Sequence, residues 1–187
     1  MSVEIVIFLI SVAVLFVTSI SILITTLRTG SPPTPSGPAL RRTIVEMLAS
    51  ADIGEGAIYE LGSGWGGLAQ ALARANPDRV VIALERSFVP WLAAETARRL
   101  LGPANLQFRR QDLSQAELSD AAAAVCYLSG ETLARIAPVL QERLPAGCRV
   151  VSATFAWPGL KPEAKVTARD VFRSPVYLYR IRPGEEP

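Results

Sequence analysis

Residues 57–67 read Ala-Ile-Tyr-Glu-Leu-Gly-Ser-Gly-Trp-Gly-Gly, an apolar segment that runs directly into a glycine-rich turn. The spacing of Leu68, Leu72 and Ala75 then predicts a helix that begins where the turn ends. Glycines let the backbone bend sharply, and they let a ligand approach the main chain at the N-terminus of a helix. A strand, a glycine turn and a helix in this order are typical of a ligand-binding unit in an α/β fold.

The segments on either side of this stretch alternate between helix and strand. Upstream, one helical face is predicted from Leu40, Ile44, Met47 and Leu48. Downstream, apolar runs predict strands within 80–85, 105–113, 121–128 and 148–155, and helices within 90–101 and 131–144. Segments 165–172 and 175–181 lie too close together for a helix between them and predict a hairpin. We therefore expect an open, doubly wound, Rossmann-like α/β fold whose mostly parallel sheet ends in a C-terminal antiparallel hairpin.

The glycine turn fits two ligand templates. Gly62, Gly64 and Gly67 match the spacing of a dinucleotide fingerprint, whereas Glu60, Gly62, Gly64 and Gly66 match the methyl-donor loop of methyltransferases. A pyrophosphate is repelled by a carboxylate two residues before the first glycine. S-adenosylmethionine carries an ammonium and a sulfonium instead, and a nearby carboxylate favours both. Glu60 therefore favours the methyl donor.

Two further acids follow the next two predicted strands. Glu85 ends the second strand and is suited to bind a ribose hydroxyl pair, and Asp112 follows the third strand, where it can accept from an adenine amino group. Because the carboxyl ends of parallel strands meet at one edge of a sheet, Glu60, Glu85 and Asp112 are expected around one crevice. The residues thus predict a site for S-adenosylmethionine.

The composition excludes several kinds of chemistry. The 187 residues include no histidine, so imidazole bases and histidine-ligated zinc are excluded, and we expect no metal. The two cysteines, Cys126 and Cys148, are expected to be small core residues. A formal net charge of +2 gives no support for a nucleic-acid partner.

The N-terminal part is the most apolar. No charged residue occurs from Ile5 to Leu27, which predicts one membrane-spanning helix in an anchor over 1–28. Arginines follow this run and none precedes it, so the rest of the chain is expected on the cytoplasmic side of a single-pass membrane protein. The run 29–39, rich in proline, glycine and serine, is expected to be a linker to a domain over 40–187.

Taken together, these motifs resemble the class I, seven-β-strand, S-adenosylmethionine-dependent methyltransferases. The specific part of the resemblance is Glu60–Gly67, Glu85 and Asp112-Leu113, together with the terminal hairpin. More narrowly, the chain is similar to the membrane-anchored protein-lysine methyltransferases and their prokaryotic relatives. That narrower resemblance is carried by the N-terminal apolar run, Tyr59–Gly64, Pro90-Trp91-Leu92, Asp112-Leu113-Ser114, Thr154-Phe155 and Trp157-Pro158.

The resemblance implies a membrane-anchored methyltransferase that uses S-adenosyl-L-methionine. Its acceptor would be a lysine of a protein at or in the membrane, and the N-terminal helix would contact the lipid bilayer. The cofactor-binding residues would be Glu60, Gly62, Ser63, Gly64, Gly66, Glu85, Arg86, Asp112 and Leu113. The pocket for the acceptor would be lined by Tyr127, Thr154 and Phe155, at the ends of the fourth and fifth strands.

Three alternatives stay open from the residues. A methyltransferase of the same fold could act on a small molecule or a lipid. An oxidoreductase would bind NAD at the same glycine turn. A non-catalytic, membrane-tethered Rossmann-like module would bind neither cofactor. Binding of S-adenosylmethionine, S-adenosylhomocysteine and NAD, compared side by side, separates these readings.

Overall fold

The computed structural model describes residues 2–29 and 35–182, apart from the side chains of 14, 17, 18 and 21–29. The chain divides into two compact units, Met1–Thr34 and Pro35–Pro187. The helices are α1 (Val3–Thr29), α2 (Pro38–Ser50), α3 (Gly67–Ala75), α4 (Phe88–Leu101) and α5 (Gly130–Arg143), with a 3-10 turn η1 (Leu113–Gln115). The strands are β1 (Ala57–Leu61), β2 (Val81–Glu85), β3 (Leu106–Arg110), β4 (Ala121–Cys126), β5 (Arg149–Ala153), β6 (Ala164–Thr167) and β7 (Pro175–Arg180).

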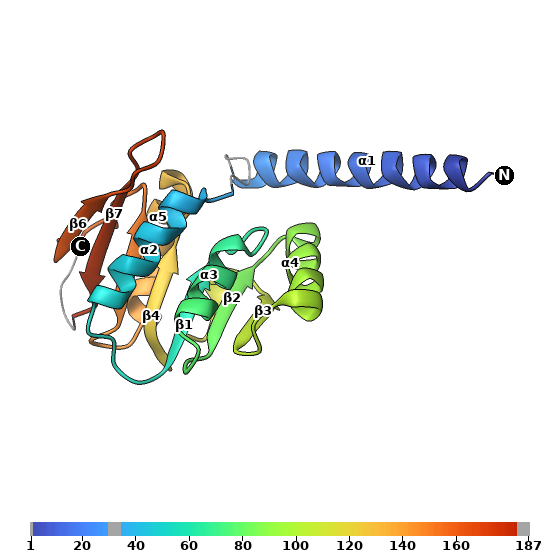
Figure 1. The fold of residues 1–187 in the computed structure, drawn as a ribbon. Coiled ribbons are helices and arrows are strands. Elements are labelled where there is room, and N and C mark those ends of the chain that lie inside the picture. The colour runs from blue at the N-terminus through green and yellow to red at the C-terminus, as the bar shows by residue number, and fades with distance from the viewer. Residues whose placement is uncertain (1, 30–34, 183–187) are drawn as a thin grey trace. The chain divides into compact units, whose positions relative to one another are not determined.

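The seven strands of the second unit form one sheet in the order β3-β2-β1-β4-β5-β7-β6 (Figure 1). The first five strands along the chain are parallel, and β7 pairs antiparallel with both β5 and β6. The strand order reverses between β1 and β4. In open α/β sheets, ligands bind outside the carboxyl ends of the strands at such a switch point. The fold therefore places the glycine turn after β1 at the expected binding edge.

Two apolar layers hold the helices on the sheet. Helices α2 and α3 pack on one face, in front of the sheet in Figure 1, through Leu40, Ile44, Leu68 and Leu72. Helix α5 covers the other face through residues such as Leu133 and Leu140. Cys126 and Cys148 are free and buried in this second layer, as the sequence predicts. The Rossmann-like sheet with its C-terminal antiparallel hairpin is confirmed.

The N-terminal unit corrects one prediction. A helix needs about 20 consecutive, predominantly apolar residues to cross a bilayer. Within residues 2–29 and 35–182, no helix is both long enough and apolar enough to do so. By this measure the predicted membrane-spanning helix is wrong, and so is the single-pass membrane location with the domain on the cytoplasmic side.

The membrane-spanning helix was predicted from a simple sequence property. The prediction rested on the length of the uncharged run from 5 to 27, whereas the finding above requires length and apolarity together over the described residues. The predicted contact of this helix with a lipid bilayer loses its basis as well. The predicted linker, 29–39, includes residues 30–34, which lie outside the described residues.

Candidate functional site

The loop between β1 and α3 has the backbone shape that its glycines predict. Gly62, Gly64 and Gly66 all have positive φ angles, of 81°, 52° and 78°. Such angles are in the left-handed region, which side chains with a Cβ atom rarely adopt. The loop is fixed to β2 at its start, because the N–H groups of Gly62 and Ser63 both donate to the Leu84 carbonyl (3.0 and 2.9 Å).

The three glycines differ in what surrounds them. A Cβ on Gly66 would lie 2.5 Å from Phe108 Cζ and 2.9 Å from Ala94 Cβ, and one on Gly62 would lie 2.5 Å from Leu128 Cδ2. These two glycines let the loop pack closely against the domain. A Cβ on Gly64 would meet no described atom within 4 Å. Gly64 is therefore the point at which a ligand can approach the main chain.

Glu85 connects the glycine loop to the start of α4. Its carboxylate accepts hydrogen bonds from the Gly64 N–H (2.9 Å) and from the Ser87 N–H (2.7 Å). Both amides belong to turns that follow strands at the carboxyl edge. The Glu85 carboxylate is thus held in place by two backbone amides. One of them belongs to Gly64, the glycine beside open space.

Glu60 lies deeper, in β1 itself. Glu60 is 3% exposed, and its Oε2 atom has no hydrogen-bond partner among the described residues. Burial, and then the charge of Glu85, raise the pKa of the Glu60 carboxyl to about 8, while the charge of Arg41 works in the opposite direction. A buried carboxyl oxygen without a hydrogen bond is costly, and a cationic ligand that reaches it would favour the charged form of the group.

Arg41 is a site residue that the sequence does not reveal. It belongs to α2, and its guanidinium lies over the start of α3, where a Cβ on Gly67 would come within 2.6 Å of Arg41 Cζ. The Ser36 hydroxyl accepts a hydrogen bond from Arg41 Nε (3.0 Å). In the sequence the Arg41-Arg42 pair indicates only a basic helix face. Its position beside Glu60 comes from how α2 packs on α3.

The remaining predicted cofactor residues are Arg86, which follows β2, and Asp112 and Leu113, which follow β3. Asp112 Oδ1 accepts from the Ser114 N–H (2.9 Å) and hydroxyl (2.7 Å), and Asp112 Oδ2 forms an ion pair with Arg86 (3.3 Å). The Ser114 hydrogen bonds are the main reason that the pKa of Asp112 is lowered. Leu113 begins η1 and packs on the α5 side of the core. The structure thus brings Arg86 and Asp112 together.

The three residues predicted for the acceptor follow β4 and β5. Tyr127 is partly buried against the α2–α3 side of the core. Thr154 has a φ of 72°, which is unusual for a β-branched residue, and its N–H donates to the Pro175 carbonyl (2.7 Å). Phe155 is 42% exposed and lies beside Gly130 at the start of α5. All three therefore lie at the same sheet edge as the glycine loop.

Several buried polar atoms without a partner belong to residues at this edge. Among the described side chains, the buried N and O atoms without a hydrogen bond are Glu60 Oε2, Ser63 Oγ, Thr154 Oγ1 and Trp157 Nε1. Three of these four belong to residues predicted from sequence to bind the cofactor or the acceptor. Since buried polar atoms are normally satisfied, this grouping fits a site that is completed by a polar ligand.

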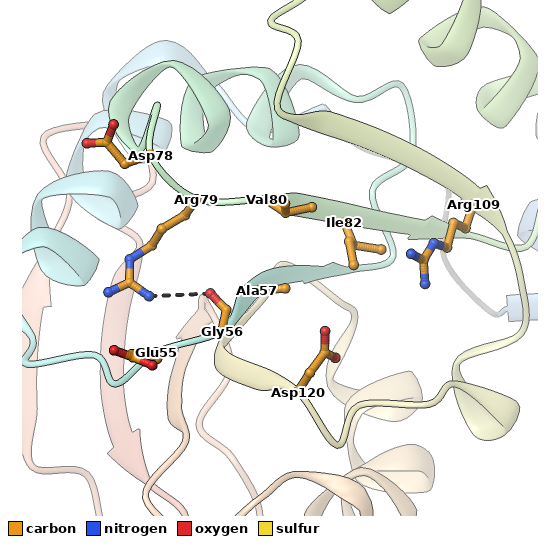
Figure 2. A pocket seen from close by; sticks show the side chains of 9 residues that line it. All are labelled: Glu55, Gly56, Ala57, Asp78, Arg79, Val80, Ile82, Arg109 and Asp120. Carbon is orange, nitrogen blue, oxygen red and sulfur yellow. Dashed lines mark hydrogen bonds between the residues drawn. The ribbon is translucent and has the colours of Figure 1, made fainter.

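A separate hollow lies at the opposite edge of the sheet, where the strands begin (Figure 2). Its volume is about 640 Å³, and it is lined by Glu55, Gly56, Ala57, Asp78, Arg79, Val80, Ile82, Arg109 and Asp120. None of the predicted site residues lines it. Its acids and arginines are mixed, and Arg79 is already engaged by the Gly54 and Gly56 carbonyls (2.7 and 3.3 Å). The hollow therefore does not compete with the carboxyl edge as the candidate site.

The family and the solved structures that resemble this chain are methyltransferases. A family described as the ANTKMT methyltransferase domain matches residues 60–164. The chain is also similar to the RNA methyltransferase from Salinibacter ruber solved with S-adenosyl-L-homocysteine. The two are 26% identical with a TM-score of 0.69, over 82% of this chain and 97% of that one. No curated protein matches the chain.

More distant structures share the fold alone. A methyltransferase from Geobacter sulfurreducens, solved with S-adenosyl-L-homocysteine, is 22% identical with a TM-score of 0.52, over 70% of this chain and 54% of that one. Magnesium protoporphyrin IX methyltransferase from Synechocystis PCC 6803, solved with its methyl donor bound, is 18% identical with a TM-score of 0.56, over 76% and 77%. The predicted cofactor, S-adenosylmethionine, is supported, and the NAD-dependent and non-catalytic alternatives are set aside.

Proposed function

This chain belongs to the ANTKMT methyltransferase domain family, within the class I S-adenosylmethionine-dependent methyltransferases, and on that basis we propose that it methylates lysine side chains of a protein. The observation that carries the proposal is the row of unpartnered buried polar atoms along one sheet edge, from Glu60 and Ser63 to Thr154. We assign the end of this row in and directly after β1 to the methyl donor, and the end after β5 to the acceptor.

The donor side offers a group for each part of the cofactor. We assign the ammonium of its amino-acid end to Glu60 and the carboxylate of that end to Arg41. The ribose hydroxyls are assigned to Glu85, and the adenine amino group to Asp112 once its Arg86 ion pair rearranges. Gly64 allows close approach to the main chain. When bound, S-adenosylmethionine supplies an electrophilic methyl group on its sulfonium.

The acceptor side must deal with a proton. A lysine has a pKa of about 10.4, so its neutral form costs on the order of 4–5 kcal/mol at pH 7. Partly buried surroundings lower that pKa, and Tyr127, Thr154 and Phe155 provide them. The Thr154 hydroxyl has no other partner among the described residues and can accept a hydrogen bond from the amine. Because the chain lacks histidine, we assign catalysis mainly to desolvation and orientation of the amine.

Two measurements on the full-length protein test this function. Calorimetric titration should show binding of S-adenosylmethionine and S-adenosylhomocysteine and no heat with NAD. Incubation with methyl-labelled cofactor and lysine-containing peptides should label the peptides, and mass spectrometry should locate the methyl group on lysine. Cofactor binding without transfer to any lysine would overturn the lysine assignment and leave the cofactor assignment standing.

RNA is a second candidate acceptor. It is favoured by the likeness to the Salinibacter ruber RNA methyltransferase, which extends over nearly the whole of that protein. The near-neutral charge of this chain does not favour it, because phosphate contacts normally require a basic surface. Incubation of labelled cofactor with total RNA, followed by nuclease or protease treatment, decides between the two. Label that is released by nuclease alone would favour RNA.

A further inference from the structure

The loop that joins β6 to β7, residues 168–174, exposes two adjacent apolar side chains. Val171 is 94% exposed and Phe172 is 87% exposed. We call residues 168–174 the hairpin tip. In Figure 1 the hairpin tip projects beyond the end of the sheet. Adjacent, highly exposed large apolar side chains are unfavourable in water and often mark a surface that meets a partner.

The hairpin tip is held in this shape by its own hydrogen bonds. The Ala168 N–H donates to the Ser174 carbonyl (2.8 Å). The Asp170 carboxylate accepts from both the N–H and the hydroxyl of Ser174 (2.8 and 2.6 Å). Arg173 has a φ of 49°, in the left-handed region, and its N–H donates to the Asp170 carbonyl (3.1 Å). Exposure of the apolar pair is therefore a fixed feature of the fold.

The hairpin tip adjoins the acceptor side of the site. Strand β7 runs antiparallel to β5 and pairs Val176 with Ala153, so the chain enters β7 at the carboxyl edge. The Thr154 N–H donates to the Pro175 carbonyl, directly after the tip. The charge of Asp170 contributes, after burial, to a raised pKa of Tyr127, which places the tip within electrostatic reach of that side chain. A molecule on the tip would thus lie next to the predicted acceptor pocket.

Charges flank the apolar pair. Arg169 and Arg173 stand on either side of it and are exposed, and neither forms an ion pair within the described part of the chain. Two cations around an apolar pair are complementary to a segment that carries apolar side chains between acidic ones. An RNA strand would meet the arginines and leave the apolar pair in water.

We propose that the hairpin tip docks the methyl-acceptor protein, through an apolar segment flanked by Asp or Glu and close to the target lysine. This inference rests on the proposed function, since it requires a protein acceptor. Val171 and Phe172 supply the contact that is buried on binding. Arg169 and Arg173 pair with the flanking acids and so set where the segment lies along the tip. The tip then determines which lysine reaches Thr154 and Tyr127.

The test uses fluorescence anisotropy with labelled peptides and the full-length protein saturated with S-adenosylhomocysteine. The peptides carry one lysine beside an apolar segment with acidic flanks, and a matched set has serines in place of the apolar residues. We expect the V171S/F172S variant to bind the apolar peptides at least about tenfold more weakly. The matched control is L100S/L101S, which changes two adjacent exposed leucines at the end of α4 and should bind like the wild type.

A charge exchange makes the test independent of folding. The R169E/R173E variant should lose affinity for acid-flanked peptides and gain affinity for peptides whose flanks are lysine or arginine. Equal binding of all peptides by the wild type and the tip variants would overturn the proposal. So would a loss of binding to anionic phosphatidylserine vesicles, or to RNA, in the tip variants with no change for peptides.

Methylation of the same peptides separates this inference from the proposed function. If lysines are methylated and the tip variants change nothing, the docking surface is wrong and the activity stands. If peptides bind through the tip but no lysine is methylated, the docking surface stands and the lysine assignment is wrong.

Discussion

The Glu85 carboxylate accepts a hydrogen bond from the Gly64 N–H at 2.9 Å, so the end of β2 holds the glycine loop that follows β1. The same carboxylate also accepts from the Ser87 N–H. One side chain therefore fixes two turns at the binding edge. This gives Glu85 a structural role in addition to the contact with ribose that we propose for it.

Replacing Glu85 with alanine should weaken cofactor binding at least about tenfold and lower the free energy of unfolding by about 1–3 kcal/mol, because two amides lose a charged acceptor. Calorimetry with S-adenosylhomocysteine and urea unfolding measure the two effects. Glu46→Ala, an exposed change on α2, is the control. Unchanged affinity in Glu85→Ala would contradict the assignment.

The raised pKa of Glu60 makes stability depend on pH. In the folded protein the carboxyl keeps its proton up to a pKa of about 8, whereas the unfolded chain releases it near 4.5. The folded state therefore binds more protons between these values, and its stability falls as the pH rises through that window. The full difference is on the order of 5 kcal/mol for this group. Urea unfolding from pH 5 to 9 should show the decline in the wild type, a smaller one in Glu60→Gln, and no change of profile in the exposed control Glu55→Gln.

Cofactor binding should release a proton from Glu60. At pH 7 the carboxyl is mostly protonated in the free protein, and an ammonium beside it favours the charged form. Calorimetry in buffers of different ionisation enthalpy should thus report release of close to one proton per cofactor in the wild type and none in Glu60→Gln. Equal proton release by both proteins would exclude Glu60 as the partner of the ammonium.

Gly66 and Gly147 separate the cost of backbone strain from the cost of crowding. Both have positive φ, 78° and 85°, but a Cβ on Gly66 would clash with Phe108 whereas one on Gly147 meets no described atom within 4 Å. Gly147→Ala should cost about 1–2 kcal/mol of stability, and Gly66→Ala about 2–5 kcal/mol. Equal losses in thermal unfolding would mean that the Gly66 side of the loop can relax.

Thr154 should show opposite effects on stability and activity. Thr154→Val removes a buried hydroxyl without a partner, so the free energy of unfolding should stay the same or rise by about 1 kcal/mol. If the hydroxyl orients the lysine amine, kcat should fall at least about tenfold, which is about 1.4 kcal/mol in the barrier. Thr154→Ser keeps the hydroxyl and should retain most of the activity. A fully active valine variant would remove Thr154 from the mechanism.

Much of the fold follows from local patterns. The apolar runs predict β1, β2 and β4 closely, because strands buried on both faces need continuous apolar residues. Glu60 and Glu85 reach the same edge because parallel strands share their carboxyl ends. These features depend on residues near one another in the chain, which is why the sequence alone predicts them.

Other features depend on packing between distant segments. Arg41 lies beside Glu60 because α2 packs on α3, and no local pattern encodes that contact. The Arg86–Asp112 ion pair joins the ends of two strands. The unpartnered Oγ1 of Thr154 depends on the backbone angle after β5. The N-terminal run shows a different kind of error. Its lack of charge predicts a membrane-spanning helix, which the described helix does not support.

The insertion of β7 between β5 and β6 has a consequence for how specificity can change. The groups assigned to the methyl donor come early in the domain, up to Leu113, whereas those assigned to the acceptor begin at Tyr127 and end in the hairpin. Substitutions in the later segment can therefore alter the choice of target while the residues assigned to the methyl donor stay unchanged. Exchanging the β6–β7 hairpin between relatives offers a direct route to redirecting the enzyme.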